Sequence, residues 1–241
     1  MASPLRRLLP CGPPVNLSPT ASVCTRGADS VSQEPFIWHP DAMSVGLQET
    51  LTEFERTSLL TPFYLAGGTG LALQLGHRHS LDLDFFTSET FDPELLLQNA
   101  QQLGGLAVLD RGSQTLHLQF RNAKVSFLGF AYPLLFSCAL FRGVKVADAR
   151  DIACMKISAL AGRGAKRDFV DLYAVSQRYE LPLLLELFQK KFSQVNYSRV
   201  HLLKSLTYFE DAEKDPMPDM RAPHSWGEVK RFFSTEAPRL L

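Results

Sequence analysis

Two short motifs constrain the fold of this chain more than any other feature of its sequence. They are Gly67-Gly68-Thr69 and Asp82-Leu83-Asp84, with twelve residues between them. The apolar stretch 63–66 predicts a short buried strand, the two glycines predict a tight turn, and residues 69–75 predict a helix. Because the first N–H groups of a helix lie unpaired at the positive end of its dipole, this arrangement favours the binding of a phosphate.

Acidic and apolar side chains alternate at 81–86. A strand has a side-chain period of two, so the two leucines and Phe85 are expected on one face and Asp82 and Asp84 on the other. The two carboxylates would lie roughly 6–7 Å apart along the strand, which is unfavourable unless a cation binds between them. Divalent cations held in this way serve phosphoryl transfer, so the pair predicts a site for Mg²⁺ or Mn²⁺ beside a nucleoside triphosphate.

Each motif alone also fits an ordinary structural role. The glycines fit a plain strand-to-helix turn with Thr69 as the N-cap, and Asp82 and Asp84 fit the solvated face of an edge strand. The presence of both motifs, together with a second block at 153–173, favours the ligand-binding interpretation.

The sequence around these motifs resembles the AbiEii/AbiGii toxin family of nucleotidyltransferases, within the DNA polymerase β-like superfamily. The resemblance covers about residues 60–180 and rests on two blocks, GHRHSLDLDFF at 76–86 and ACMKISALAGRGAKRDFVDLY at 153–173. It implies an α+β fold, in which a nucleotidyltransferase-like mixed sheet with flanking helices is followed by a helical C-terminal region.

The resemblance also implies a role for residues in each block. Asp82 and Asp84 would bind the metal, Lys156 would neutralise triphosphate oxygens as charge builds on the leaving pyrophosphate, and Asp168 would orient Lys156 or accept a proton. The expected catalytic residues are Asp82, Asp84, Lys156 and Asp168. The expected nucleotide-binding residues are Gly67, Gly68, Thr69, Lys156, Arg163, Arg167 and Asp171.

The second block and the loop before the acidic strand have plainer interpretations as well. Lys156 fits a surface lysine that lays its stem along apolar neighbours, and Asp168 and Asp171 fit acidic residues favoured by a helix dipole. The loop 77–79 is expected to touch the acceptor or to be solvated.

One position departs from the pattern of the superfamily. A third carboxylate is usual there, on a strand paired with the acidic strand, and here that position corresponds to Ser126. A serine is a poor magnesium ligand and no general base at neutral pH. The departure leaves three alternatives open: one-metal chemistry, another base such as Asp168, or lost activity.

The function implied by the resemblance is transfer of a nucleoside monophosphate from a triphosphate to an acceptor hydroxyl, on an RNA end such as that of tRNA or on a protein. It further implies the toxin of a type IV toxin–antitoxin or abortive-infection pair, with a cognate antitoxin. A catalytically inactive nucleotide-binding regulatory protein is the alternative. A phosphatase of the haloacid-dehalogenase kind with Asp82 as nucleophile is disfavoured by Phe85-Phe86 and by the hairpin-rich middle of the chain.

Composition narrows the class of protein. The 241 residues carry 25 basic and 25 acidic side chains, which argues against a strongly basic surface, and their apolar runs are too short to span a membrane. Four cysteines without metal-binding or disulfide spacing indicate a reducing, cytoplasmic setting. Residues 1–43 are rich in Pro, Ser and Gly and predict a disordered leader.

Periodicity and capping signals divide the rest of the chain. Ser44 is expected to cap a helix with an apolar stripe that reaches Ser58, Asp92-Pro93 to open a second helix, and residues 106–128 to form hairpin strands. A short strand pair at 141–146 would complete a catalytic core over 44–147. Residues 148–241 are then expected to be a helical region that completes the active cleft.

Overall fold

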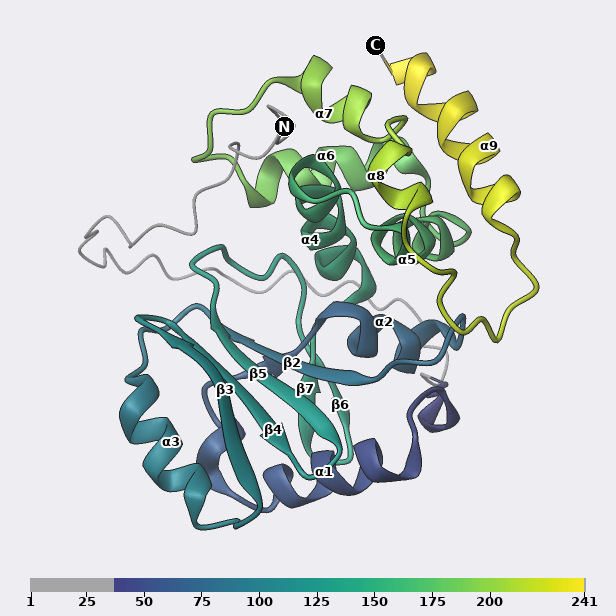
Figure 1. Cartoon of the computed structure of the whole chain (residues 1–241). Coiled ribbons are helices and arrows are strands. Elements are labelled where there is room, and N and C mark those ends of the chain that lie inside the picture. Colours follow the sequence, from purple (N-terminus) through teal and green to yellow (C-terminus); the bar gives the residue numbers. More distant parts are fainter. Residues whose placement is uncertain (1–36, 241) are drawn as a thin grey trace, which may run out of the picture.

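A mixed β-sheet forms the lower half of this computed structural model, which describes residues 37–240 (Figure 1). The strand order is β3-β4-β5-β2-β1-β7-β6, with β2 parallel to β5 and β1 parallel to β7. The strands are β1 (Tyr64–Leu65), β2 (Asp82–Thr87), β3 (Leu106–Gly112), β4 (Thr115–Phe120), β5 (Ala123–Gly129), β6 (Ala139–Phe141) and β7 (Val144–Val146).

Helices flank the sheet and then form the whole C-terminal part. The α-helices are α1 (Val45–Glu55), α2 (Gly67–Leu75), α3 (Pro93–Gln101), α4 (Ala149–Gly162), α5 (Lys166–Ser176), α6 (Leu181–Lys191), α7 (Arg199–Ser205), α8 (Glu210–Glu213) and α9 (Trp226–Glu236). Short 3₁₀ turns are η1 (Pro40–Ala42), η2 (Ser58–Leu60) and η3 (Ala237–Leu240). The expected α+β class is confirmed. Within residues 37–240, no helix combines the length and apolar character needed to cross a membrane.

Side-chain caps mark the start of two helices, and the cap at Ser44 lies where the sequence predicts it. Ser44 accepts a hydrogen bond from the N–H of Leu47 at 3.2 Å, and Asp148 accepts one from the N–H of Arg150 at 2.8 Å. These bonds satisfy N–H groups that the first turn of a helix leaves without partners. They explain why α1 and α4 begin where they do.

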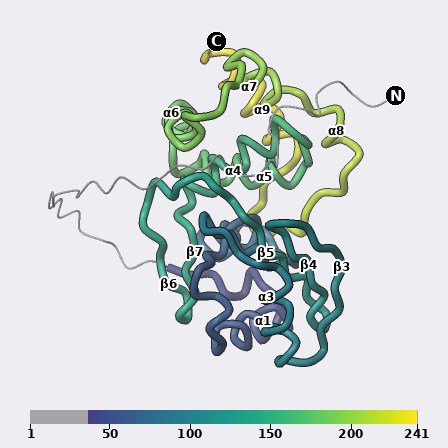
Figure 2. The backbone as a smooth tube through the Cα atoms, turned by 90° about the vertical axis from the view of Figure 1, so that its left-hand side faces the viewer, coloured from purple at the N-terminus to yellow at the C-terminus, as the bar shows by residue number. Residues whose placement is uncertain are grey.

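Two hydrophobic cores lie on opposite faces of the sheet. One packs α1 and α3 against inward-facing strand residues such as Phe85 and Phe127. The other joins α2 to the helices of the C-terminal region, with Ile152 and Phe169 among its fully buried members. Figure 2 shows the consequence: the helices α4 to α9 form a layer above the sheet, while α1 and α3 lie below it.

Three boundaries differ from the prediction. Residues 1–36 of the predicted leader lie outside the described residues, but the ordered fold begins before residue 44, because Ala42 and Met43 are buried and the N–H of His39 donates to the carbonyl of Leu73 at 2.8 Å. Helix α1 ends at Glu55, so Ser58 is not part of its stripe. Leu81 lies just before β2 and is 74% exposed, so the alternation of the strand begins only at its first aspartate.

Candidate active site

The glycine turn and the acidic strand meet directly in the structure. The N–H of Ala66 donates to the carbonyl of Asp84 at 3.0 Å, which fixes the turn beside β2. Gly67 has a φ of +62°, and a Cβ at this position would lie 2.8 Å from Oδ2 of Asp84. A side chain is therefore excluded at Gly67 both by the backbone conformation and by the neighbouring carboxylate.

The second glycine makes room for an arginine. A Cβ on Gly68 would collide with the Nη2 atom of Arg78, and the Cζ atom of that guanidinium would lie only 3.2 Å away. Arg78 is buried and cannot move aside freely, because its guanidinium donates to a buried carboxylate. The packing of Arg78 thus requires a glycine at position 68, independently of any role of Gly68 in binding a phosphate.

This packing predicts that Gly68→Ala destabilises the protein. The added methyl group must displace Arg78 from its buried partner, and overpacking of this kind costs about 1–3 kcal/mol. The loss should appear in the free energy of unfolding measured with urea. Gly46→Ala in α1 is the matched control, since a Cβ there meets nothing within 4 Å. An equal response of the two variants would contradict the proposed contact.

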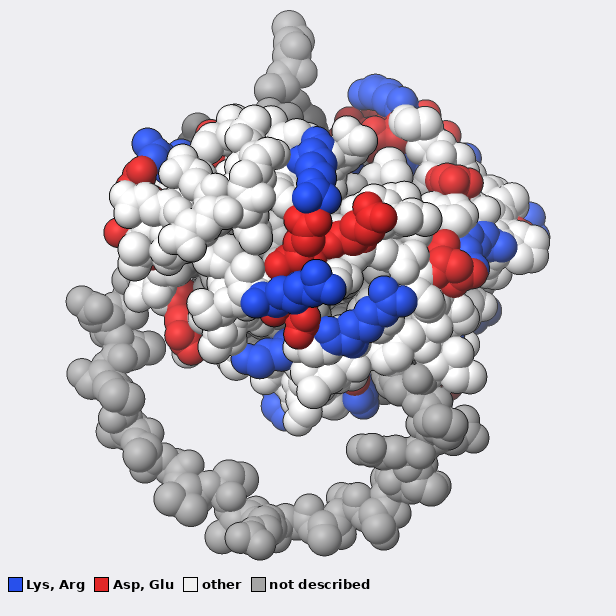
Figure 3. All heavy atoms as spheres, turned by 90° about the horizontal axis from the view of Figure 1, so that it is seen from below, with Lys and Arg blue, Asp and Glu red and all other residues white. Residues whose placement is uncertain are grey.

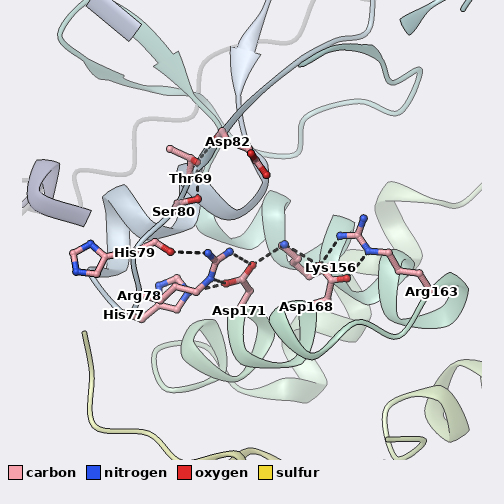
Figure 4. Close-up of polar contacts among 10 residues, drawn as sticks. All are labelled: Thr69, His77, Arg78, His79, Ser80, Asp82, Lys156, Arg163, Asp168 and Asp171. Carbon is pink, nitrogen blue, oxygen red and sulfur yellow. Dashed lines mark hydrogen bonds and ion pairs between the residues drawn. The ribbon is translucent and has the colours of Figure 1, made fainter. Parts of the chain in front are cut away.

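Asp171 is the centre of a buried cluster of charged side chains (Figure 4). Its carboxylate accepts hydrogen bonds from Arg78, at 2.6 Å from Nε and 2.9 Å from Nη2, and from Nε2 of His77 at 2.8 Å. Nζ of Lys156 lies 2.6 Å from its Oδ2. Burial alone would raise the pKa of Asp171, but Lys156 and Arg78 outweigh burial and hold that pKa well below its ordinary value.

Asp168, one helical turn earlier on α5, extends the cluster toward solvent. It accepts hydrogen bonds from Nζ of Lys156 at 3.0 Å and from Arg163 at 2.7 Å from Nε and 2.9 Å from Nη2. Burial opposes ionisation of Asp168, yet Lys156 and Arg163 lower its pKa. Burial likewise lowers the pKa of Lys156, but Asp171 and Asp168 more than reverse this effect and raise it. All three groups therefore stay charged at neutral pH.

The charged cluster around Asp171 lies close to the acidic strand β2. In Figure 4 the carboxylate of Asp82 points from the start of β2 toward the side on which Lys156 lies. The carboxylate of Asp82 attracts the guanidinium of Arg78 electrostatically, and the carboxylate of Asp84 attracts that of Arg163. Two partly exposed carboxylates, a buried ammonium group and a half-exposed guanidinium thus surround one region between the sheet and the helical layer.

Two predicted nucleotide-binding residues, Thr69 and Arg167, are not part of the charged cluster. The hydroxyl of Thr69 is buried, pairs with the hydroxyl of Ser80 at 2.7 Å and donates to the backbone carbonyl of Asp82. Arg167 is exposed on α5. The predicted contacts of these two residues with the nucleotide stay predictions, and the hydroxyl of Thr69 already holds α2 against β2.

Sequence reasoning missed the role of the loop before β2. His77 and Arg78 are not solvated, since their side chains are 3% and 8% exposed and both reach Asp171. Burial lowers the pKa of His77 despite Asp171, so the ring is neutral at pH 7. His79, in contrast, points away from the cluster in Figure 4. No local signal marks Arg78 as buried, because its partner lies 93 residues away in the chain.

The carboxylates of Asp82 and Asp84 could bind one divalent cation if substrate phosphates supplied further ligands. Within the described part of the chain, no group of three or more His, Cys, Asp or Glu residues could hold a metal. Asp84 stands directly opposite Ser126 in the parallel β2–β5 register, so the strand neighbour offers a hydroxyl instead of a third carboxylate. Mg²⁺ commonly binds one or two carboxylates and completes its shell with water and substrate phosphates, which suits Asp82 and Asp84.

Comparisons with known proteins agree with this geometry. The family model "Nucleotidyl transferase AbiEii toxin, Type IV TA system" matches residues 49–136 and 130–238. An uncharacterized protein of Aquifex aeolicus (strain VF5) is 36% identical over 200 residues, which are 80% of this chain and 95% of the relative.

Two solved structures share the fold. JHP933 from Helicobacter pylori is similar with a TM-score of 0.52 and 18% identity, covering 84% of this chain and 93% of that chain. MenT4, a nucleotidyltransferase toxin from Mycobacterium tuberculosis H37Rv, has a TM-score of 0.50 and 18% identity, covering 78% of this chain and 85% of its own. Taken with the family match, these observations show that the chain belongs to the AbiEii family of nucleotidyltransferase toxins.

Proposed function

We propose that this nucleotidyltransferase moves a nucleoside monophosphate from a nucleoside triphosphate to an acceptor hydroxyl and uses Mg²⁺ or Mn²⁺ held by Asp82 and Asp84. The observation that carries the proposal is the contact between the carboxylate of Asp84 and the glycine turn at Gly67. This contact supports the proposal, because a carboxylate suited to a metal lies beside a helix end suited to a phosphate. A cation held there would neutralise charge at the transferred phosphoryl group and at the leaving pyrophosphate.

Lys156 is suited to stabilise the triphosphate. An ammonium group has three N–H donors, and two of them point to Asp168 and Asp171. Among the contacts within residues 37–240, these two leave the third N–H for a phosphate oxygen. Because both carboxylates hold the ammonium in place before the reaction, little reorganisation is needed as negative charge builds on the leaving group.

Arg163 is suited to contact the outer phosphates. Its side chain is 54% exposed, and its hydrogen bonds within residues 37–240 use Nε and Nη2. Nη1 is not used by these bonds. The planar guanidinium can bind a phosphate while Asp168 fixes its orientation.

An RNA end is the proposed acceptor, and an antitoxin is the proposed partner. The family description, a toxin of a type IV toxin–antitoxin system, favours a cognate antitoxin as partner. The RNA end proposed as acceptor, such as that of tRNA, rests on the sequence resemblance alone. On the face seen from below in Figure 3, basic and acidic side chains alternate across the visible surface, so this face offers no field of a single sign for RNA. A cytoplasmic location stays a prediction.

A label-transfer assay tests the proposed function. The chain is incubated with each α-labelled nucleoside triphosphate, Mg²⁺ and a total RNA preparation, and in parallel with total protein. Label is expected to appear on RNA and to require the metal. Binding of a triphosphate with no transfer to either pool would instead favour the inactive regulatory alternative.

Arg163→Met is expected to weaken triphosphate binding. A hydrogen bond to a charged group contributes about 1.5–3 kcal/mol, so KM for the triphosphate should rise at least about tenfold. Lys156 still pairs with Asp168 in this variant, so the unfolding temperature should change much less than KM. Arg199→Met, on the exposed side of α7, is the control that should leave both values unchanged. An unaltered KM in Arg163→Met would remove Arg163 from the site.

A further inference from the structure

A row of polar residues crosses the sheet and ends at the acidic pair. In the strand register, Asp110 of β3 stands opposite His117 of β4, His117 opposite Ser126 of β5, and Ser126 opposite Asp84 of β2. Directly opposite residues of neighbouring strands project from the same face of a sheet. The row therefore leads along one face from the edge strand to the proposed metal site.

This face of the sheet is polar where the other face is apolar. The residues before and after His117 on β4 are Leu116 and Leu118, both fully buried in the core with α1 and α3. On the polar face His117 is only partly buried, as are Thr115 and Gln119 on either side of it. A substrate that lies on this face can therefore reach the imidazole.

Ser126 holds the imidazole in place. Its side chain is 1% exposed, and its Oγ lies 2.9 Å from Nδ1 of His117. The Nδ1 edge of the ring thus faces β5, the strand that separates β4 from β2. Adjacent strands lie about 4.8 Å apart, so the main chains of His117 and Asp84 are separated by roughly 10 Å, which the two side chains and one hydroxyl group between them can bridge.

The proposed reaction needs a group that takes the proton of the acceptor hydroxyl. Asp168 and Asp171 are unsuited to this task, because each is fully buried and bound by two or more cationic or N–H donors. Those donors also hold the pKa of both carboxyls low. Asp82 and Asp84 are assigned to the cation. In the row that leads to the acidic pair, Asp110 lies on the far edge strand and Ser126 is no general base at neutral pH, so His117 remains.

We propose that His117 is the general base that activates the acceptor, an inference that rests on the proposed function. With Nδ1–H donating to Ser126 Oγ, the lone pair of Nε2 takes the proton of the acceptor hydroxyl. The acceptor oxygen then forms a bond to the α-phosphorus. The bond from that phosphorus to the bridging oxygen breaks, and pyrophosphate leaves with the electron pair.

Charged side chains near His117 come from the two strands that pair with β4. The charged neighbours on the packed strands are Asp110 of β3, which is exposed, and Lys124 of β5, which is exposed and stands opposite Gln119. The neighbours on its own strand, Thr115 and Gln119, are uncharged. Asp84 is one strand further away, beyond Ser126.

Single-turnover rates of label transfer, measured with α-labelled triphosphate and a total RNA preparation from about pH 5 to pH 8, test this proposal. In the wild type the rate is expected to fall toward acid pH, because protonation removes the lone pair of Nε2. His117→Gln should lower the rate by about 10²- to 10⁴-fold and remove the fall toward acid pH. Triphosphate binding, measured separately by calorimetry, should be unchanged.

Two further variants separate a base from a structural role. Ser126→Ala removes only the orienting bond, so it should lower the rate less than His117→Gln does and keep the fall toward acid pH. Gln119→Ala, on the same face of β4, should leave the rate and its pH profile unchanged. Ser126→Ala inactive while His117→Gln remains active would overturn the proposal, since the serine would then be the reacting group.

The outcomes also separate this proposal from the proposed function. If the wild type transfers label but His117→Gln keeps the same pH profile, or loses only RNA affinity, His117 is not the base and the function stands. If the wild type transfers no label to any acceptor, the proposed function itself fails, and the role of His117 fails with it.

Discussion

Replacing both Asp82 and Asp84 with asparagine is expected to abolish label transfer. Both carboxylates project from one face of β2, and in the proposed function they hold the cation on which transfer of the phosphoryl group would depend. Loss of several kcal/mol of charge stabilisation corresponds to a decrease of about 10³-fold or more in rate. Transfer rates at saturating Mg²⁺ and triphosphate measure the effect.

The same variant should fold normally. Removing two neighbouring negative charges relieves their repulsion but also removes their attraction to Arg78 and Arg163, so the unfolding temperature should change little. Glu89→Gln, which neutralises an exposed carboxylate shortly after the end of β2, is the matched control and should transfer label at the wild-type rate. Transfer by the double variant at more than a few per cent of the wild-type rate would contradict the assignment of these carboxylates to the metal.

Asp171→Asn is expected to have the largest effect on stability. The substitution leaves Arg78 buried without the charge that compensates it and leaves Lys156 with Asp168 alone, and breaking a buried ion pair from one side costs about 3–5 kcal/mol. It also loosens the connection between the loop before β2 and the helical layer. Urea unfolding at neutral pH measures the loss. Asp211→Asn is the control, because its pair with Lys214 is exposed and 3.4 Å long.

The effect of Asp171→Asn should depend on pH in one direction. The folded-state pKa of Asp171 lies well below its ordinary value, so its stabilising contribution is complete above the unfolded-state pKa of about 3.9. As pH falls below that value toward the folded-state pKa, the wild type loses this contribution and the variant does not. The difference between the two should therefore shrink in acid, and a difference that stays constant from neutral to acid pH would exclude an ionised Asp171 as its cause.

Features that depend on neighbouring residues could be predicted from the sequence. The alternation at Asp82 and Asp84 follows from the two-residue period of a strand, and Ser44 and Ser225 cap their helices through bonds to residues three positions along. The capping box of Ser225 and Glu228 forms as its spacing predicts. The two blocks that carry the family resemblance are likewise contiguous, so the family could be identified without coordinates.

The tertiary structure decided the roles of residues whose partners are distant in the chain. It buries Arg78 and Lys156 against Asp171, and it places the guanidinium of Arg78 where a side chain on Gly68 would lie. It also sets His117 beside Ser126, which stands opposite Asp84. Periodicity cannot reveal these pairings, because the residue type alone does not show whether a charged side chain is solvated or paired in the interior. Local spacing thus determined the elements, the motifs and the family of this protein. The cost of burying a charge without a partner, which only the assembled fold resolves, decided how the charged residues are paired around the site.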